Sequence, residues 1–130
     1  MPVTNVSPRY SHIDFTPTAA MQREAEQGLD WWRSYAGRGG NEVALARAWR
    51  IRRTAPLSPD VIRRMVSHMA RLEGRKIVQG WNEQDADYPS HSRVSWSLMG
   101  GDPGYAWARA IVEQMDYADA DLTPNQRAGL

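Results

Sequence analysis

Apolar residues recur every three or four positions along several stretches of the chain, the spacing that places them on one face of an α-helix. Thr16-Pro17 is expected to begin the first helix, because threonine caps helix N-termini and proline suits the first turn. The glycines of Gly37-Arg-Gly-Gly40 end it, and Asn41 is expected to cap a second helix that runs to about Arg53. The predicted apolar faces are Met21, Ala25, Leu29, Trp32 and Ala36 in the first helix, and Leu45, Ala46 and Trp49 in the second.

A third helix is predicted from Ser58-Pro59-Asp60, which places a capping serine, a proline and an acidic residue at its start, to about Leu72. Residues 75–88 then show no steady period and form a loop that carries Trp81 and Tyr88. Loops of this length in compact domains tend to be functional or to be anchored by aromatic residues. The predicted core face of the third helix is Ile62, Met65, Met69 and Leu72.

Two further helices are predicted on either side of the hinge Gly100-Gly-Asp-Pro-Gly104. Ser90 is placed to cap the first of them, and the glycines supply the left-handed backbone conformation that ends it. Asp102-Pro103 is expected to provide the N-cap and the first-turn residue of the last helix. The large rings of Trp96 and Trp107, which flank the hinge, favour burial in a common core.

No alternating run bounded by a hairpin turn predicts a strand pair, so the expected fold class is all-α: a compact bundle of about five short helices with an extended N-terminal arm. Residues 1–15 hold two prolines and no helical period, and form the arm. Residues 16–118 form the helical domain, and residues 119–130 a flexible acidic tail. The arm docks either on its own domain or on a neighbour through the apolar anchors Tyr10, Ile13 and Phe15.

The chain has 130 residues, which favours one domain, and it lacks cysteine, which excludes disulfides and thiolate metal sites. No apolar run approaches the roughly 20 residues that span a bilayer. The N-terminus shows no basic segment followed by an apolar stretch. We therefore expect a soluble protein without an export signal and without a membrane partner.

Charge is spread unevenly along the chain, although the net charge is only +1. Residues 33–76 hold eleven Arg or Lys and three acidic residues, a net of +8, whereas residues 77–130 hold three arginines and eight acidic residues, a net of −5. This separation suits a polyanionic partner, a contact between copies of the chain, or attraction between two faces of one molecule.

The basic residues of the middle segment span two predicted helices joined by a short turn, which superficially resembles helix-turn-helix architecture. The second of these helices contains no Asn or Gln, the side chains that usually read bases, so a DNA contact there would be to backbone phosphates without sequence preference. The competing interpretation is a face that meets acidic protein surface or solvent. The predicted basic face is Arg47, Arg50, Arg53, Arg63, Arg64, Arg71, Arg75 and Lys76.

The sequence has neither a Gly-x-Ser-x-Gly elbow nor a phosphate loop ending in Gly-Lys-Ser/Thr. We interpret His12 and His68 as surface or packing residues. His91 with Asp85 and Asp87 is the one cluster that resembles a metal or acid/base site, and its spacing is not that of a known ligand set. We therefore assign no catalytic residue, no metal and no cofactor, and expect no enzyme.

Six tryptophans are present, and most of them fall at helical core positions. Trp31 and Trp32 are adjacent and project about 100° apart on one helix, so both are buried only under a broad contact. Indole rings are favoured anchors at protein interfaces. The aromatic residues proposed for a partner interface are Trp31 and Trp81.

Five separated blocks of the chain occur in a characteristic order, and most of their distinctive residues are ones that begin or end helices. The blocks are Tyr10-Ser-His-Ile-Asp-Phe-Thr-Pro17, Gly37-Arg-Gly-Gly40, Ala44-Leu-Ala-Arg-Ala48, Leu57-Ser-Pro-Asp-Val-Ile-Arg-Arg-Met65 and Tyr88-Pro-Ser-His-Ser-Arg-Val-Ser-Trp-Ser-Leu-Met-Gly-Gly-Asp102. Together, over about residues 10–115, they resemble a segment that recurs in larger head-associated or structural virion proteins of tailed bacteriophages. The chain departs from that pattern at Leu72-Glu-Gly-Arg-Lys76, where His-Glu-Val-Asp-Lys-like residues are common, and at Met99, which replaces a Trp.

The resemblance implies a non-enzymatic virion structural protein that binds capsid or head proteins as a decoration, cement or head-associated component. Such a protein resides in the virion, and in the host cytoplasm during assembly. Its arm anchors Tyr10, Ile13 and Phe15 would then lie in a groove of an adjoining subunit, either another head protein or a copy of itself.

Two alternatives remain open from the sequence. The first is a phage nucleic-acid-binding protein that uses the arginine-rich face of residues 47–76. The second is a small enzyme or enzyme regulator built on the loop of residues 75–91, which substitution of His91 and Asp87 would test.

Overall fold

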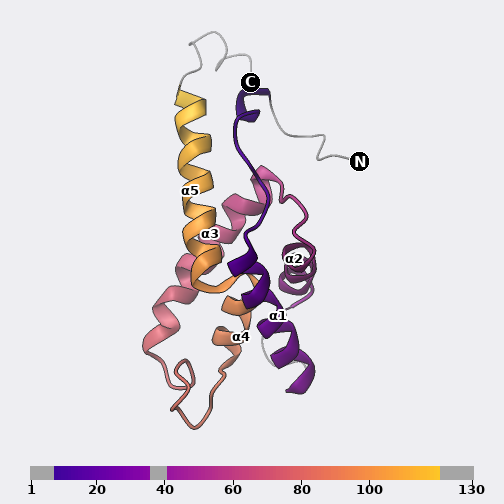
Figure 1. Cartoon of the computed structure of the whole chain (residues 1–130). Helices are drawn as coiled ribbons and strands as arrows, with labels where there is room; N and C mark the ends of the chain where they lie inside the picture. Colours follow the sequence, from indigo (N-terminus) through magenta and orange to yellow (C-terminus); the bar gives the residue numbers. More distant parts are fainter. Residues whose placement is uncertain (1–7, 36–40, 121–130) are drawn as a thin grey trace.

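The computed structural model describes residues 8–35 and 41–120, and over these ranges the chain is all-α, with no strand. The predicted bundle of five helices is confirmed (Figure 1). The α-helices are α1 (Ala19–Ser34), α2 (Glu42–Arg52), α3 (Pro59–Glu73), α4 (His91–Leu98) and α5 (Gly101–Ala120), with short 3-10 helices η1 (Pro8–Tyr10) and η2 (Gly74–Ile77).

Three of the predicted helix starts are confirmed by side-chain caps. The Ser58 hydroxyl accepts the backbone N–H of Val61 at the start of α3, and Ser90 does the same for Arg93 at the start of α4. The side-chain oxygen of Asn41 caps α2. These caps satisfy N–H groups that have no partner within the helix, which is why short polar residues define the starts.

The other two predicted starts are wrong. Helix α1 is capped by Thr18, whose hydroxyl accepts the N–H of Met21, and it therefore begins after Thr16-Pro17. Helix α5 begins at Gly101, so Asp102 lies in its first turn and is not the N-cap. The Asp102 carboxylate instead accepts the indole N–H of Trp96 at 2.8 Å.

The apolar anchors of the N-terminal segment lie in the core of their own chain. Tyr10, Ile13 and Phe15 are each 6–7% exposed and belong to the main core cluster. Figure 1 shows this segment returning beside α5, and the N–H of Leu57 donates to the carbonyl of Phe15 at 3.1 Å. Residues 8–15 are thus part of the domain, and the expectation that these anchors lie in a neighbour's groove is corrected. Residues 1–7 of the predicted arm lie outside the described part.

The predicted acidic tail begins two residues too early. Asp119 lies in α5, which runs to Ala120, and its carboxylate accepts the hydroxyl of Tyr10 at 2.8 Å and the Nε–H of Arg9 at 2.6 Å. The end of α5 is therefore joined to the start of the described chain. The remaining tail, residues 121–130, falls outside the described residues.

The predicted apolar face of α2 is also corrected. Ala44, Ala48 and Ile51 are buried, whereas Ala46 and Trp49 are exposed. Small side chains at spacings of four and three let α2 approach α1 and α4 closely, and the large indole is left outside. Arg47 falls on this buried face.

Helices α2 and α3 are held by different neighbours. Helix α2 packs on α1 and α4, whereas α3 packs mainly on α5, and α2 and α3 make little direct contact with each other in the described chain. In helix-turn-helix proteins the two helices pack as one unit, so the resemblance to that architecture does not extend to this packing. The space between α2 and α3 is where the predicted basic residues meet.

Candidate anion-binding site

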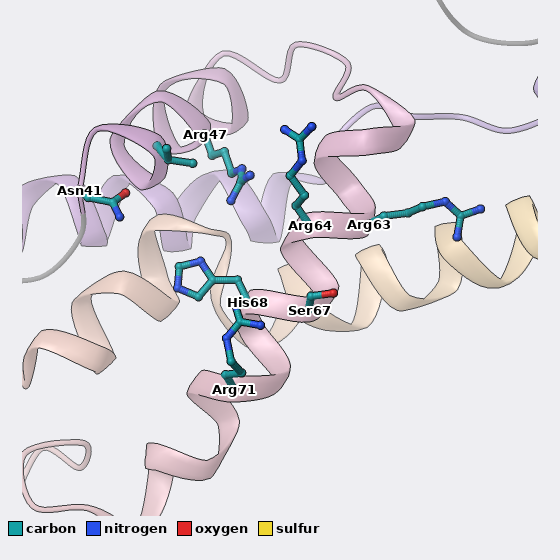
Figure 2. Close-up of a pocket in the computed structure, with 8 residues that line it drawn as sticks. Asn41, Arg47, Arg63, Arg64, Ser67, His68 and Arg71 are labelled. Carbon is teal, nitrogen blue, oxygen red and sulfur yellow. The ribbon is translucent and has the colours of Figure 1, made fainter.

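A solvent-open cavity of about 420 Å³ separates α2 from α3 (Figure 2). Asn41, Val43 and Arg47 line it from the α2 side. The α3 side contributes Arg63, Arg64, Ser67, His68 and Arg71. The lining of this α2–α3 cavity contains several cations and no carboxylate. Such a composition is suited to an anion and not to a metal ion.

Arg47 is the most deeply placed cation of the α2–α3 cavity. Its side chain is 7% exposed, and it forms no hydrogen bond or ion pair within the described residues. No fully enclosed side-chain nitrogen in the described chain lacks a partner, so the unpaired guanidinium nitrogens reach the cavity. Burial, assisted by Arg64, lowers the pKa of Arg47 below its usual value. Arg47 therefore presents, at the floor of the cavity, donors that no described residue uses.

The α3 wall is a single helical face, because Arg64, Ser67, His68 and Arg71 follow spacings of three, one and three. Neither Arg64 nor Arg71 pairs with a carboxylate of the described chain. Burial lowers the pKa of His68, and the neighbouring Arg71 and Arg47 lower it further. A neutral imidazole near pH 7 adds one N–H donor to the guanidinium groups and the Ser67 hydroxyl.

Arg63 differs from the other arginines of the α2–α3 cavity because it is paired within the molecule. Its guanidinium donates to Asp116 at 3.0 Å and to Asp119 at 3.4 Å. Figure 2 shows its side chain directed away from Arg47 and toward α5. Burial alone would lower the pKa of Arg63, but the hydrogen bonds and charges of Asp116 and Tyr10 together outweigh it and raise the pKa. Part of the charge separation in the sequence is thus satisfied by attraction within one molecule.

The other members of the predicted basic face lie elsewhere. Arg50 donates to the carbonyl of Pro56 at 2.8 Å, and Arg53 is exposed at the end of α2. Arg75 and Lys76 lie in η2, beyond α3, where Lys76 pairs with the carboxylate of Asp102 at 3.2 Å. The predicted face is therefore divided, and only its α2–α3 part converges on one cavity.

The two aromatic residues proposed for a partner interface make contacts within the chain. The Trp31 ring meets Tyr88 edge-on with centroids 5.4 Å apart, and the guanidinium of Arg93 lies 5.1 Å from its centroid. The Trp81 ring lies 5.6 Å from that of Trp96. Both indoles are partly buried, and Trp81 anchors the long loop after η2.

The loop cluster considered for a metal or acid/base role has a structural explanation. The Asp85 carboxylate accepts the backbone N–H groups of Gly80 and Asn82, which holds the loop closed. Asp87 and His91 are exposed. Over residues 8–35 and 41–120, no group of three His, Asp or Glu side chains is placed to hold a metal ion.

Sequence reasoning identified Arg47, Arg64 and Arg71 but missed the uncharged residues around them. Ser67 and His68 share the face of α3 that carries Arg64 and Arg71, and this spacing was available in the sequence. Asn41 and Val43 join the cavity only through the placement of α2, which no local pattern reports.

No protein-family model matches the chain, and neither does any curated protein or solved structure. The likeness to virion proteins of tailed phages therefore stays a prediction. Within the described residues, no helix is both long and apolar enough to cross a membrane.

Proposed function

We propose that the protein is a non-enzymatic nucleic-acid-binding component of tailed-phage particles that holds backbone phosphates in the α2–α3 cavity. The observation that carries the proposal is the convergence of Arg47, Arg64 and Arg71 from two helices on one cavity without a carboxylate partner in the described chain. Guanidinium groups bind phosphate oxygens through paired, charge-assisted hydrogen bonds. Because these three arginines meet without a carboxylate partner in the described chain, they are better suited to binding an anionic ligand than to a purely structural role.

The contact is expected to be independent of base sequence. The cavity offers arginines, one histidine and one serine from α3, and the amide oxygen of Asn41 is occupied by the N–H of Ala44. Contacts of this kind position a protein on the phosphate backbone and carry no sequence information. The particle context rests on the resemblance to virion proteins alone.

Capsid binding, which the resemblance to virion proteins implies, was expected to use the apolar anchors of the N-terminal arm, and these are not available to a neighbouring subunit. Tyr10, Ile13 and Phe15 are in the core, so the arm has no apolar side chains from this set to offer a neighbouring subunit. The α2–α3 cavity, in contrast, is open to solvent, and its residues Arg47, Arg64 and Arg71 have no carboxylate partner among the described residues. Nucleic-acid binding, the first alternative from the sequence, is for this reason preferred over capsid binding.

Binding of a 20-base-pair duplex over a series of salt concentrations tests the proposal. The Arg64→Gln/Arg71→Gln variant is expected to lose one to two orders of magnitude in affinity, and its slope of log affinity against log salt is expected to fall by about 2, since each phosphate contact contributes roughly 0.9. Arg23→Gln/Arg109→Gln is the matched control, because it removes the same charge from exposed sites on α1 and α5.

An equal loss of affinity in the two double variants would mean that DNA binding depends only on net charge, and it would contradict the proposed site. Absence of any binding to DNA by the wild-type protein would contradict the function itself.

The particle context is tested separately by quantitative mass spectrometry on DNA-filled particles and empty shells of the encoding phage. Presence only in DNA-filled particles is the expected result. Equal copy numbers in both would favour a capsid contact, and absence from both would remove the virion assignment.

A further inference from the structure

Arg47 is recessed, unlike Arg64 and Arg71, which are exposed on the α3 rim of the α2–α3 cavity. A phosphodiester inside a duplex is tethered on both sides, so it reaches the rim more readily than the floor. A terminal phosphate is tethered by one bond only and projects beyond the last nucleotide. The recessed position of Arg47 therefore favours a terminal phosphate over a phosphodiester inside a duplex.

We infer that the floor of the α2–α3 cavity is a site for a phosphate monoester, such as the phosphorylated 5′ end of a DNA strand. This inference rests on the proposed function for its DNA source, and the site chemistry itself needs only the monoester. Inorganic phosphate shares that chemistry and is the second source to be distinguished.

The donors of the cavity suit the charge and shape of this ligand. A monoester carries three terminal oxygens and a charge of about −1.5 to −2 at pH 7, whereas a diester carries two and a charge of about −1. Arg47 supplies donors from the floor, and Arg71 and Arg64 supply them from the rim, and none of these three side chains pairs with a carboxylate in the part of the chain that the structure describes. His68 and the Ser67 hydroxyl lie on the same wall and accommodate a third oxygen.

The absence of carboxylates around Arg47 is the feature that points to a ligand and not to a structural role. A buried guanidinium in a stable core is ordinarily paired, because removing an unpaired charge from water is strongly unfavourable. In the described chain that pairing is missing at Arg47, whereas Arg63 of the same cavity is paired with Asp116 and Asp119 of α5. An incoming dianion would complete the coordination of Arg47.

The test compares two duplexes that differ only in having a 5′-phosphate or a 5′-hydroxyl at one end. The wild-type protein is expected to bind the phosphorylated duplex about tenfold more tightly. Arg47→Met is expected to bring this ratio to about one, and Arg23→Gln, which removes an exposed charge that does not line the α2–α3 cavity, is expected to keep the wild-type ratio. Equal affinities for the two duplexes, or a preference that survives in Arg47→Met, would overturn the inference while leaving the proposed function standing.

Thermal stability in inorganic phosphate tests the monoester site independently of DNA binding. At constant ionic strength, phosphate is expected to raise the wild-type melting temperature above its value in chloride, and this rise is expected to vanish in Arg47→Met and to shrink in Arg71→Gln. Phosphate stabilisation without any DNA binding would support the monoester site and contradict the proposed function. No stabilisation by phosphate would overturn the site.

Discussion

Arg47 occupies a position on α2 that packing alone would assign to an apolar residue. Ala44, Ala48 and Ile51 on the same face are fully buried or nearly so, and Arg47 is only 7% exposed. Its guanidinium loses hydration without gaining a carboxylate in the described chain, and burial accordingly lowers its pKa. Residues that weaken the fold in this way are typical of binding sites, where stability is sacrificed to function.

Arg47→Met is therefore expected to raise the free energy of unfolding by about 1 kcal/mol, because methionine keeps the apolar stem and removes the desolvated charge. Urea denaturation measures the change. Arg63→Met is the control, since the Arg63 guanidinium is paired with Asp116 and Asp119 and its loss should not stabilise the protein. A decrease in stability for Arg47→Met as large as that for Arg63→Met would show that Arg47 is structural.

His68 makes stability depend on pH in the weakly acidic range. Burial, with Arg71 and Arg47, holds its pKa below the value of 6.5 expected for the unfolded chain. Because the folded state binds the proton less readily, the contribution of His68 to stability is fully present above pH 6.5 and is lost as pH falls toward the folded pKa. His68→Gln is expected to flatten the fall in melting temperature between about pH 7.5 and pH 5. An unchanged pH profile in the variant would contradict this account.

At the scale of elements, the crossing of α1 and α4 depends on a glycine in the middle of α1. A Cβ atom at Gly28 would lie 2.7 Å from the backbone nitrogen of Leu98, which is closer than such atoms approach in proteins. The absence of a side chain lets α4 lie directly on α1. Helix α2, which lines one side of the α2–α3 cavity, packs on both α1 and α4 and therefore depends on this crossing for its position.

Gly28→Ala is expected to lower the free energy of unfolding by about 1–3 kcal/mol, because the clash with backbone outweighs the roughly 1 kcal/mol that alanine adds to helix stability. Gly74→Ala is the matched control: its φ is −64°, and no atom lies within 4 Å of the added Cβ. Thermal denaturation of both variants measures the difference. A neutral Gly28→Ala would mean that α1 and α4 are not in close contact.

At the scale of the whole molecule, the end of α5 joins three parts of the chain. Asp119 accepts hydrogen bonds from Arg9, Tyr10 and Arg63. Burial alone would raise the pKa of Asp119, but the hydrogen bonds from Arg9 and Tyr10, together with the nearby charges of Arg9 and Arg63, lower it. Its stabilising contribution is therefore complete above the unfolded pKa of about 3.8 and is lost as pH falls below that value.

Asp119→Asn is expected to loosen the docking of residues 8–15 at neutral pH. The amide of Ile13, which donates to the carbonyl of Tyr10 at 2.9 Å, should exchange faster with solvent hydrogen in this variant. Asp116→Asn is the control, because Asp116 pairs with Arg63 alone among the described residues. Equal exchange rates in the two variants would contradict the role given to Asp119.

Local signals in the sequence were sufficient for helix α3 and insufficient for α2. Ser58, Met65 and Met69 define the start and core face of α3 through capping and period alone, and the structure agrees. In α2 the predicted apolar face was Leu45, Ala46 and Trp49, whereas the choice of the buried face is made by packing against α1 and α4, which lie elsewhere in the chain. The burial of Arg47 follows from that choice, so its role was not evident from spacing.

The N-terminal segment shows the same limit on a larger scale. The apolar anchors Tyr10, Ile13 and Phe15 indicated that the segment docks, but no local pattern shows which surface it meets. The answer depends on Asp119, more than 100 residues away. Docking within the chain, rather than on a neighbour, becomes apparent only when the N-terminal segment and α5 are both placed in space.

The most direct test of the central claim is a map of amide and arginine side-chain NMR shifts while a short 5′-phosphorylated duplex is added. Binding in the α2–α3 cavity predicts that the large changes fall in residues 41–47 and 63–71, with the Arg47 side chain among them. Changes centred on the loop of residues 75–90 or on the outer face of α5, or no changes at all, would contradict the claim that this cavity binds nucleic-acid phosphate.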